Sequence, residues 1–275
     1  MGEHGRSEIL KKYDRQFSGL AKNLLDLMNL DCIITQSSKD HLKFAIRDSI
    51  LYRFQSIRFH LDLLLQTYEM MLIRCYENFL HEDICKLENE IKKVFFIFDD
   101  IVFNICSMLD YFGNMIGYLY MGENKSKIKW NGVVKSAHDK NNKFSDSEIA
   151  ECIKKEHKEW VDHLFCYRSM LIHHRIDGSQ IRRSLKYDGV EQNYDVELFI
   201  GIPVGFLKTM KVVSMEEADA KGLSIIDIAI WLSSQSLETA SYLTKKLKDE
   251  IRPVIMRNVE KKIEKLRKGR PELFK

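Results

Sequence analysis

The stretch VFFIFDDIVFNICSMLDYFGNMIGYLY, from Val94 to Tyr120, is the most apolar part of the chain. Near Val94 to Phe103, apolar side chains occur on almost every side of a helix, which is typical of a helix in the middle of a bundle. The stretch therefore predicts a buried core helix that begins near Glu82. Acidic and amide side chains within it argue against a membrane span: Asp99, Asp100, Asn104, Asp110 and Asn114.

Two more long helices are predicted before this stretch. Apolar residues at helical spacing run from His41 to Phe79 without a glycine or proline, and an amphipathic pattern covers Ser7 to Leu30. We expect a break between these helices, over Asp31 to Ser38. The whole chain of 275 residues holds 13 glycines and 3 prolines. This shortage argues against a turn-rich all-β fold, so the predicted class is mainly all-α.

The region after the core helix predicts one more long helix. Ser145-Asp146-Ser147-Glu148 matches a capping box, with Ser145 at the N-cap and Glu148 at the third helical position. The helix that it opens is expected to end at His174 or Arg175, just before an Asp-Gly turn.

Residues 181–213 differ from the rest of the chain because β-forming residues alternate or cluster there. Three segments show this pattern: Ile181–Tyr187, Asp195–Ile202 and Thr209–Val213. They predict two or three short strands, which form a small antiparallel flap added to the helical body. We interpret residues 1–275 as a single helical domain that carries this insertion.

A final long helix is predicted from about Ser224 to Glu250. Pro253 is expected to interrupt it, which leaves a separate basic helix over 254–275.

Bulk properties of the chain narrow the class of protein. The net charge is +3 and the isoelectric point is near 8.4. This charge is too small to indicate nucleic-acid binding on its own.

The 6 cysteines are spread singly and the N-terminal residues lack an apolar signal segment, so we expect reduced thiols in a cytoplasmic protein. Phosphate-binding loops, zinc spacings and a nucleophile elbow are missing from the sequence. We therefore expect no metal, no cofactor and no membrane partner.

One short motif carries candidate chemistry. It is Tyr167-Arg168-Ser169-Met170-Leu171-Ile172-His173-His174-Arg175, near the end of the helix that begins at 145–148. Histidine titrates near neutral pH and suits a general base, whereas the planar fork of arginine grips phosphate with two hydrogen bonds. Arg168 and His173 together therefore suit proton transfer beside a bound phosphate group.

This motif resembles the R-x4–6-H motif of the HEPN superfamily, a group of helical domains many of which are metal-independent ribonucleases. The resemblance implies an HEPN-like helical bundle with Arg168 and His173 as catalytic residues and Ser169 beside them. The family prefers Asn, Asp or His where Ser169 stands. The resemblance also implies a homodimer in which two copies of the motif form one site on RNA. It further implies a toxin–antitoxin or defence setting, with an antitoxin or regulatory partner.

Other residues are expected to support this site. His174 is the alternative to His173, because five intervening residues also fit the motif. Asp110 and Asn114, four apart on the core helix, either hydrogen-bond the motif or form a buried structural pair. The remaining candidates are basic residues that are expected to contact RNA: Arg175, Arg257, Lys261, Lys265 and Lys268.

Two other pairs fit the same spacing, namely Arg53 with His60 and Arg74 with His81. We interpret both as coincidental, because an apolar residue follows each arginine and both lie in apolar, mid-helix sequence. The alternative function for the whole chain is a non-catalytic helical bundle that mediates dimerisation or binds a nucleotide or RNA.

Overall fold

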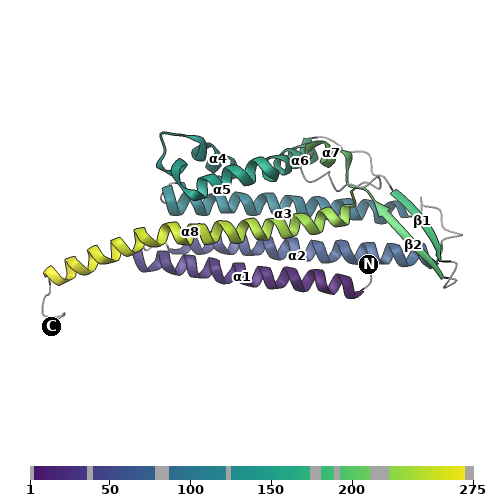
Figure 1. Ribbon diagram of the computed structural model, residues 1–275, viewed down its shortest axis with the longest axis horizontal. Coiled ribbons are helices and arrows are strands. Elements are labelled where there is room, and N and C mark those ends of the chain that lie inside the picture. The colour runs from purple at the N-terminus through teal and green to yellow at the C-terminus, as the bar shows by residue number, and fades with distance from the viewer. Residues whose placement is uncertain are drawn as a thin grey trace. The chain divides into compact units, whose positions relative to one another are not determined.

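The computed structural model describes residues 3–35, 40–77, 87–121, 125–173, 181–188, 193–210 and 223–269. Within these ranges most residues are helical, which confirms the predicted class. The long helices in Figure 1 are α1 (Glu3–Thr35), α2 (Asp40–Glu77), α3 (Glu88–Met121) and α8 (Ile225–Gly269). In the part of the chain that the structure describes, no helix is both long and apolar enough to cross a membrane.

Shorter elements connect α3 to α8. They are α4 (Trp130–His138), a 3-10 turn (Lys143–Asp146), α5 (Glu148–Glu156), a π turn (His157–Val161), α6 (Asp162–His173), β1 (Ile181–Asp188), β2 (Asn193–Ile200) and α7 (Val204–Thr209).

The chain divides into two compact units, and each long helix contributes residues to both. Unit 1 comprises Met1–Arg15, Arg53–Met108 and Lys155–Ser236, and unit 2 comprises Gln16–Tyr52, Leu109–Lys154 and Leu237–Lys275. Each unit has its own buried apolar residues. Those of unit 1 include Phe54, Leu61, Leu64, Val94, Phe98 and Ile101, and those of unit 2 include Leu20, Leu24, Ile50, Phe112, Ile116 and Leu243.

In unit 1, polar contacts join α1 to α2. The Arg6 guanidinium lies 2.8 Å from Asp62 and 3.3 Å from Glu69. The buried Tyr13 hydroxyl donates a hydrogen bond to the Phe54 carbonyl at 2.8 Å. A buried hydroxyl needs such a partner, because an unpaired polar group in a core destabilises the fold.

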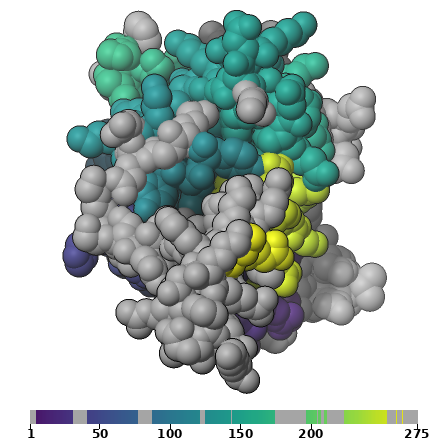
Figure 2. Space-filling view, turned by 90° about the vertical axis from the view of Figure 1, so that its left-hand side faces the viewer, coloured from purple at the N-terminus to yellow at the C-terminus, as the bar shows by residue number. Residues whose placement is uncertain are grey.

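In unit 2, carboxylates join α8 to its neighbours. Glu250 accepts a hydrogen bond from the Ile149 amide at 2.9 Å, at the start of α5. Lys246 pairs with Glu148, and Lys248 lies 3.1 Å from Asp26 of α1. Figure 2 shows this end of unit 2, where the teal residues of α4 and α5 lie above the yellow of α8.

Two glycines of α3 allow the chain before α4 to pass close to the helix. A Cβ atom on Gly113 would lie 2.6 Å from the Lys129 carbonyl carbon and 2.6 Å from the Trp130 nitrogen. A Cβ atom on Gly117 would lie 2.3 Å from the Lys125 carbonyl oxygen. The close approach places Trp130 fully inside the core, with no exposed surface.

The structure corrects the predicted helix boundaries in two places. The break expected over 31–38 does not begin at Asp31, because α1 continues to Thr35. Pro253 does not interrupt α8, so the basic segment after 254 continues the same helix to Gly269. A proline removes one backbone hydrogen bond and bends a helix without always ending it. Figure 1 shows that α8 bends in its C-terminal part.

The start of α5 differs from the predicted capping box. Lys143–Asp146 form a 3-10 turn, and the N-cap is Ser147, whose hydroxyl accepts a hydrogen bond from the Ala150 amide at 3.0 Å. Ser145 is therefore not the cap, and Glu148 is the first helical residue. Two serines that are two residues apart offer the same side-chain acceptor, so the capping pattern alone cannot choose between them.

The predicted flap is an antiparallel hairpin of β1 and β2. Ile181 lies opposite Ile200 and Asp188 opposite Asn193. The Tyr68 hydroxyl of α2 donates a hydrogen bond to the Leu198 carbonyl, which ties the hairpin to the helices of unit 1. The third predicted strand is wrong at Thr209, which ends helix α7. The rest of that segment, 211–213, lies outside the described residues.

Candidate active site at the end of helix α6

A π turn precedes the motif helix. The Asp162 amide donates to the His157 carbonyl, five residues back, whereas an α-helix uses a spacing of four. The buried Trp160 in this turn donates its indole N–H to Glu156 at 2.7 Å. Its ring also packs edge-on against Trp231 of α8, with centroids 6.3 Å apart. These contacts fix the wide turn from which α6 begins.

Tyr167 anchors α6 in the core of unit 1. It is fully buried, and its ring packs edge-on against Phe206 of α7 at 4.9 Å. Its hydroxyl donates a hydrogen bond to Asp99 of α3 at 3.1 Å. Burial raises the pKa of Asp99 to about 6, although the Tyr167 hydrogen bond acts in the opposite direction. Burial, with the nearby Asp99 charge, also raises the pKa of Tyr167 well above its ordinary value. The role of Tyr167 is therefore to pack α6 against α3 and α7.

Arg168 and Ser169 follow this anchor. The Arg168 side chain is half-buried, and its guanidinium carbon lies 5.7 Å from the centre of the Phe103 ring on α3. This is a cation–π contact, which holds the charge at a defined place. Ser169 and His173 are both exposed. Being four residues apart, they lie on one side of the helix, one turn from each other.

His173 is the last residue of α6. Positions five apart on a helix diverge by about 140°, so the backbone alone does not aim Arg168 and His173 at the same point. The long Arg168 side chain has to reach around the helix toward His173 for the two groups to contact one phosphate. The alternative base, His174, and the predicted RNA contact Arg175 lie outside the described residues.

Asp110 and Asn114 are the predicted supporting pair on α3. They belong to unit 2, whereas the motif of α6 belongs to unit 1. The backbone N–H of Trp130 donates to Asp110 Oδ1 at 3.3 Å. The Asn114 Oδ1 atom is buried without a hydrogen-bond partner among the described residues. Asp110 therefore helps to hold the start of α4. The last part of α8 carries the predicted RNA contacts, whose side chains lie outside the description: Arg257, Lys261, Lys265 and Lys268.

The structure gives the Arg53 and His60 pair an organisation that the sequence interpretation missed. Seven residues are almost two full helical turns, so both side chains lie on the same face of α2. Arg53 donates to Asn104 of α3 at 3.1 Å, and His60 Nε2 lies 3.5 Å from Asp100. The Ser56 carbonyl accepts from His60 Nδ1 at 2.7 Å, which places the ring proton on Nδ1. The signal that could have found this cluster is the seven-residue spacing. His81, the partner expected for Arg74, lies outside the described residues.

Comparison of the chain with family models, with curated proteins and with solved structures finds no match of any of the three kinds.

The half-buried Asp99 carboxyl makes the stability of the fold depend on pH. Its pKa is about 6 in the folded chain and about 4 in an unfolded one, so the folded state binds the extra proton between these values. Stability should therefore fall as pH rises from 4 to 7. Asp99→Asn keeps an acceptor for Tyr167 and removes the charge. We expect it to reduce that fall by about 2 kcal/mol, allowing for the partial exposure of the carboxyl.

Urea unfolding of both proteins at pH 4.5 and pH 7.5 measures this difference. The exposed Asp249 provides a matched control, because Asp249→Asn changes the net charge equally. An Asp99→Asn protein with the pH dependence of the wild type would contradict the expectation.

Proposed function

We propose that the chain is a HEPN-type endoribonuclease that cleaves RNA without a metal ion at the end of α6. One observation carries the proposal. The half-buried Arg168 is held against Phe103, while Ser169 and His173 are exposed on the adjoining turns of the same helix. A positioned cation and an accessible histidine are the two groups that phosphodiester cleavage by a neighbouring hydroxyl requires.

The reaction follows from the two side chains. His173 takes the proton from the ribose 2′-OH, whose oxygen then attacks the adjacent phosphorus. Arg168 donates hydrogen bonds to the phosphate oxygens as negative charge builds on them. The P–O5′ bond breaks, and the leaving oxygen takes up a proton. The products carry a 2′,3′-cyclic phosphate and a 5′-hydroxyl, and Ser169 supplies a further hydrogen bond to the substrate.

The test uses the purified protein of residues 1–275, single-stranded RNA and excess EDTA. We expect slow cleavage that leaves 2′,3′-cyclic phosphate ends. Cleavage that leaves 3′-hydroxyl ends, or that is lost in EDTA, would contradict the proposed chemistry.

The proposal includes a homodimer in which two copies of the motif face each other. Ile172 supports this part, because its apolar side chain, next to His173 in the last turn of α6, is 56 % exposed. An exposed apolar residue of this kind gains stability by burial against a second surface.

Ile172→Glu should therefore convert the dimer into a monomer, because it would place a charge in the interface. Sedimentation velocity at tens of micromolar protein measures this change. Ile73→Glu is the control, since Ile73 lies on α2 and is 57 % exposed. A wild-type protein that sediments only as a monomer would count against the interface and against a shared site.

The second candidate function is a non-catalytic bundle that dimerises or binds RNA or a nucleotide. The exposed Ile172 also favours this function, because an interface at the end of α6 does not require chemistry. Intact RNA after prolonged incubation with a confirmed dimer would favour it.

We also propose that the protein acts in the cytoplasm, in a toxin–antitoxin or defence setting with a regulatory partner. Support for the compartment comes from the sequence, in which the 6 cysteines are spread singly rather than in a disulfide or zinc spacing.

A further inference from the structure

A groove between α2 and α3 of unit 1 uses none of the residues of the α6 motif. It encloses about 480 Å³ and is lined mainly by apolar side chains, among them Leu63, Met70, Met71, Phe96 and Ile97. Phe96 and Met70 are 65 % and 57 % exposed, so large apolar surfaces border the opening. Volumes of about 300–1,000 Å³ with mostly apolar walls are typical of sites for small molecules.

The charged side chains that line the groove do not cancel one another. Arg74 Nη1 lies 2.8 Å from Glu90 Oε1, so these two charges neutralise each other at one end. Thr67 is satisfied by the Leu63 carbonyl, to which its hydroxyl donates at 2.8 Å. The third charged group is Lys93, which leaves the lining with one net positive charge.

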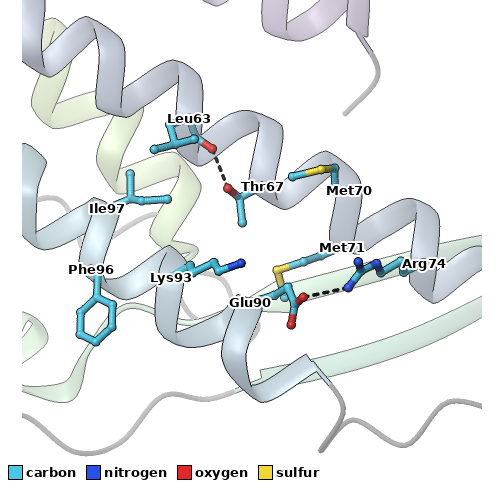
Figure 3. Close-up of a pocket in the computed structure, with 9 residues that line it drawn as sticks. All are labelled: Leu63, Thr67, Met70, Met71, Arg74, Glu90, Lys93, Phe96 and Ile97. Atoms are coloured by element: carbon cyan, nitrogen blue, oxygen red, sulfur yellow. Dashed lines mark hydrogen bonds and ion pairs between the residues drawn. The ribbon is translucent and has the colours of Figure 1, made fainter.

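Lys93 directs its charge into the groove. Figure 3 shows its side chain reaching from α3 toward Thr67 and Met71, with the nitrogen between them. Among the described residues, its ammonium takes part in no ion pair. It lies close enough to Glu90 to help lower the pKa of that carboxyl, after the larger effects of the Glu90 backbone amide and Arg74. An anion in the groove would therefore meet a positive charge that has no partner within hydrogen-bond distance among these residues.

We propose that this groove binds a single-chain amphiphile with a monoanionic head group, such as a medium-chain carboxylate. The hydrocarbon chain lies along Leu63, Met70, Met71, Phe96 and Ile97, where its burial is favourable. The carboxylate pairs with the Lys93 ammonium. One net positive charge matches one negative head group, whereas a cationic amphiphile would repel Lys93.

Calorimetric titration of the full chain with two probes of equal chain length tests the proposal. The probes are decanoate and decyltrimethylammonium, each used below the concentration at which it aggregates. We expect decanoate to bind about tenfold more tightly or better, because only its head group gains a charge-assisted hydrogen bond. Lys93→Met should weaken decanoate binding about tenfold and remove the preference. Lys93→Arg should restore it.

Lys92→Met is the matched control. Lys92 is the adjacent residue, pairs with Glu88 at 2.6 Å and is not part of the groove lining. Its replacement changes the net charge equally and should leave decanoate affinity unchanged. Equal affinity for the two probes, no decanoate binding, or equal losses in Lys92→Met and Lys93→Met would each overturn the proposal. Because the readout is binding, its failure is distinct from a failure of RNA cleavage.

Discussion

Replacing His173 by alanine should lower the rate of RNA cleavage in EDTA by about 10²-fold or more. A positioned general base contributes about 10²–10⁴ in rate, and the proposed reaction has no other base within the described motif. Arg168→Ala should cost a similar factor because it removes the phosphate clamp. Arg168→Lys should recover little of the loss, since a lysine lacks the planar fork. Initial rates on a labelled RNA measure each effect.

The controls for this prediction come from the chain itself. His60→Ala should leave cleavage intact, because we interpret its pairing with Arg53 as coincidental to activity. His174→Ala should have a small effect. If His174→Ala abolishes cleavage and His173→Ala does not, the catalytic register is wrong by one residue. If His60→Ala and Arg53→Ala abolish cleavage instead, the catalytic site is the Arg53 and His60 pair on α2.

Every variant needs a folding check by circular dichroism. A histidine at a helix C-terminus can contribute up to about 2 kcal/mol through the helix dipole, so loss of His173 affects stability as well as chemistry.

Gly113→Ala should destabilise unit 2 by about 3 kcal/mol, the second large effect that we expect. The new methyl group would meet the Lys129 carbonyl carbon and the Trp130 nitrogen at 2.6 Å, and backbone atoms cannot move aside by changing a rotamer. The segment that leads into α4 would have to move away from α3 and would carry Trp130 with it. Urea unfolding followed by tryptophan fluorescence measures the loss.

Gly19→Ala is the control for this substitution. Gly19 is also helical, in α1, and a Cβ atom built there meets nothing within 4 Å. The alanine should therefore stabilise the protein by up to about 1 kcal/mol, the usual gain from replacing a glycine inside a helix. A Gly113→Ala protein as stable as Gly19→Ala would show that the close approach of the 125–130 segment is wrong.

The core helix could be predicted from sequence because apolar side chains occur on almost every side of it between Val94 and Phe103. Val94, Phe98, Ile101 and Ile105 are indeed completely buried in α3. The hairpin could be predicted because β-forming residues alternate or cluster in both strand segments. Boundaries were less predictable where two residues compete for one role, as Ser145 and Ser147 do for the cap of α5. At Pro253, the loss of one backbone hydrogen bond did not end the helix.

The candidate site was predictable only in part. Residue types and spacing pointed to Arg168 and His173, but the contact between Arg168 and Phe103 depends on how α6 packs on α3. No spacing rule could show that contact. The Arg53 and His60 pair on α2 was missed for the opposite reason. Its helical geometry was available from the sequence, but the apolar residue after Arg53 carried more weight in the interpretation.

The π turn at His157–Val161 affects how the chain tolerates changes in its length. Its five-residue spacing accommodates about one residue more than an α-helix would use over the same rise. Deleting one residue in an ordinary helix rotates everything beyond it by about 100°. Deleting the exposed Lys158 or Glu159 would instead convert the wide turn into regular α-helix and leave Tyr167 facing Asp99. The motif helix therefore begins at a point where the loss of a single codon can be absorbed without changing which side chains face the core.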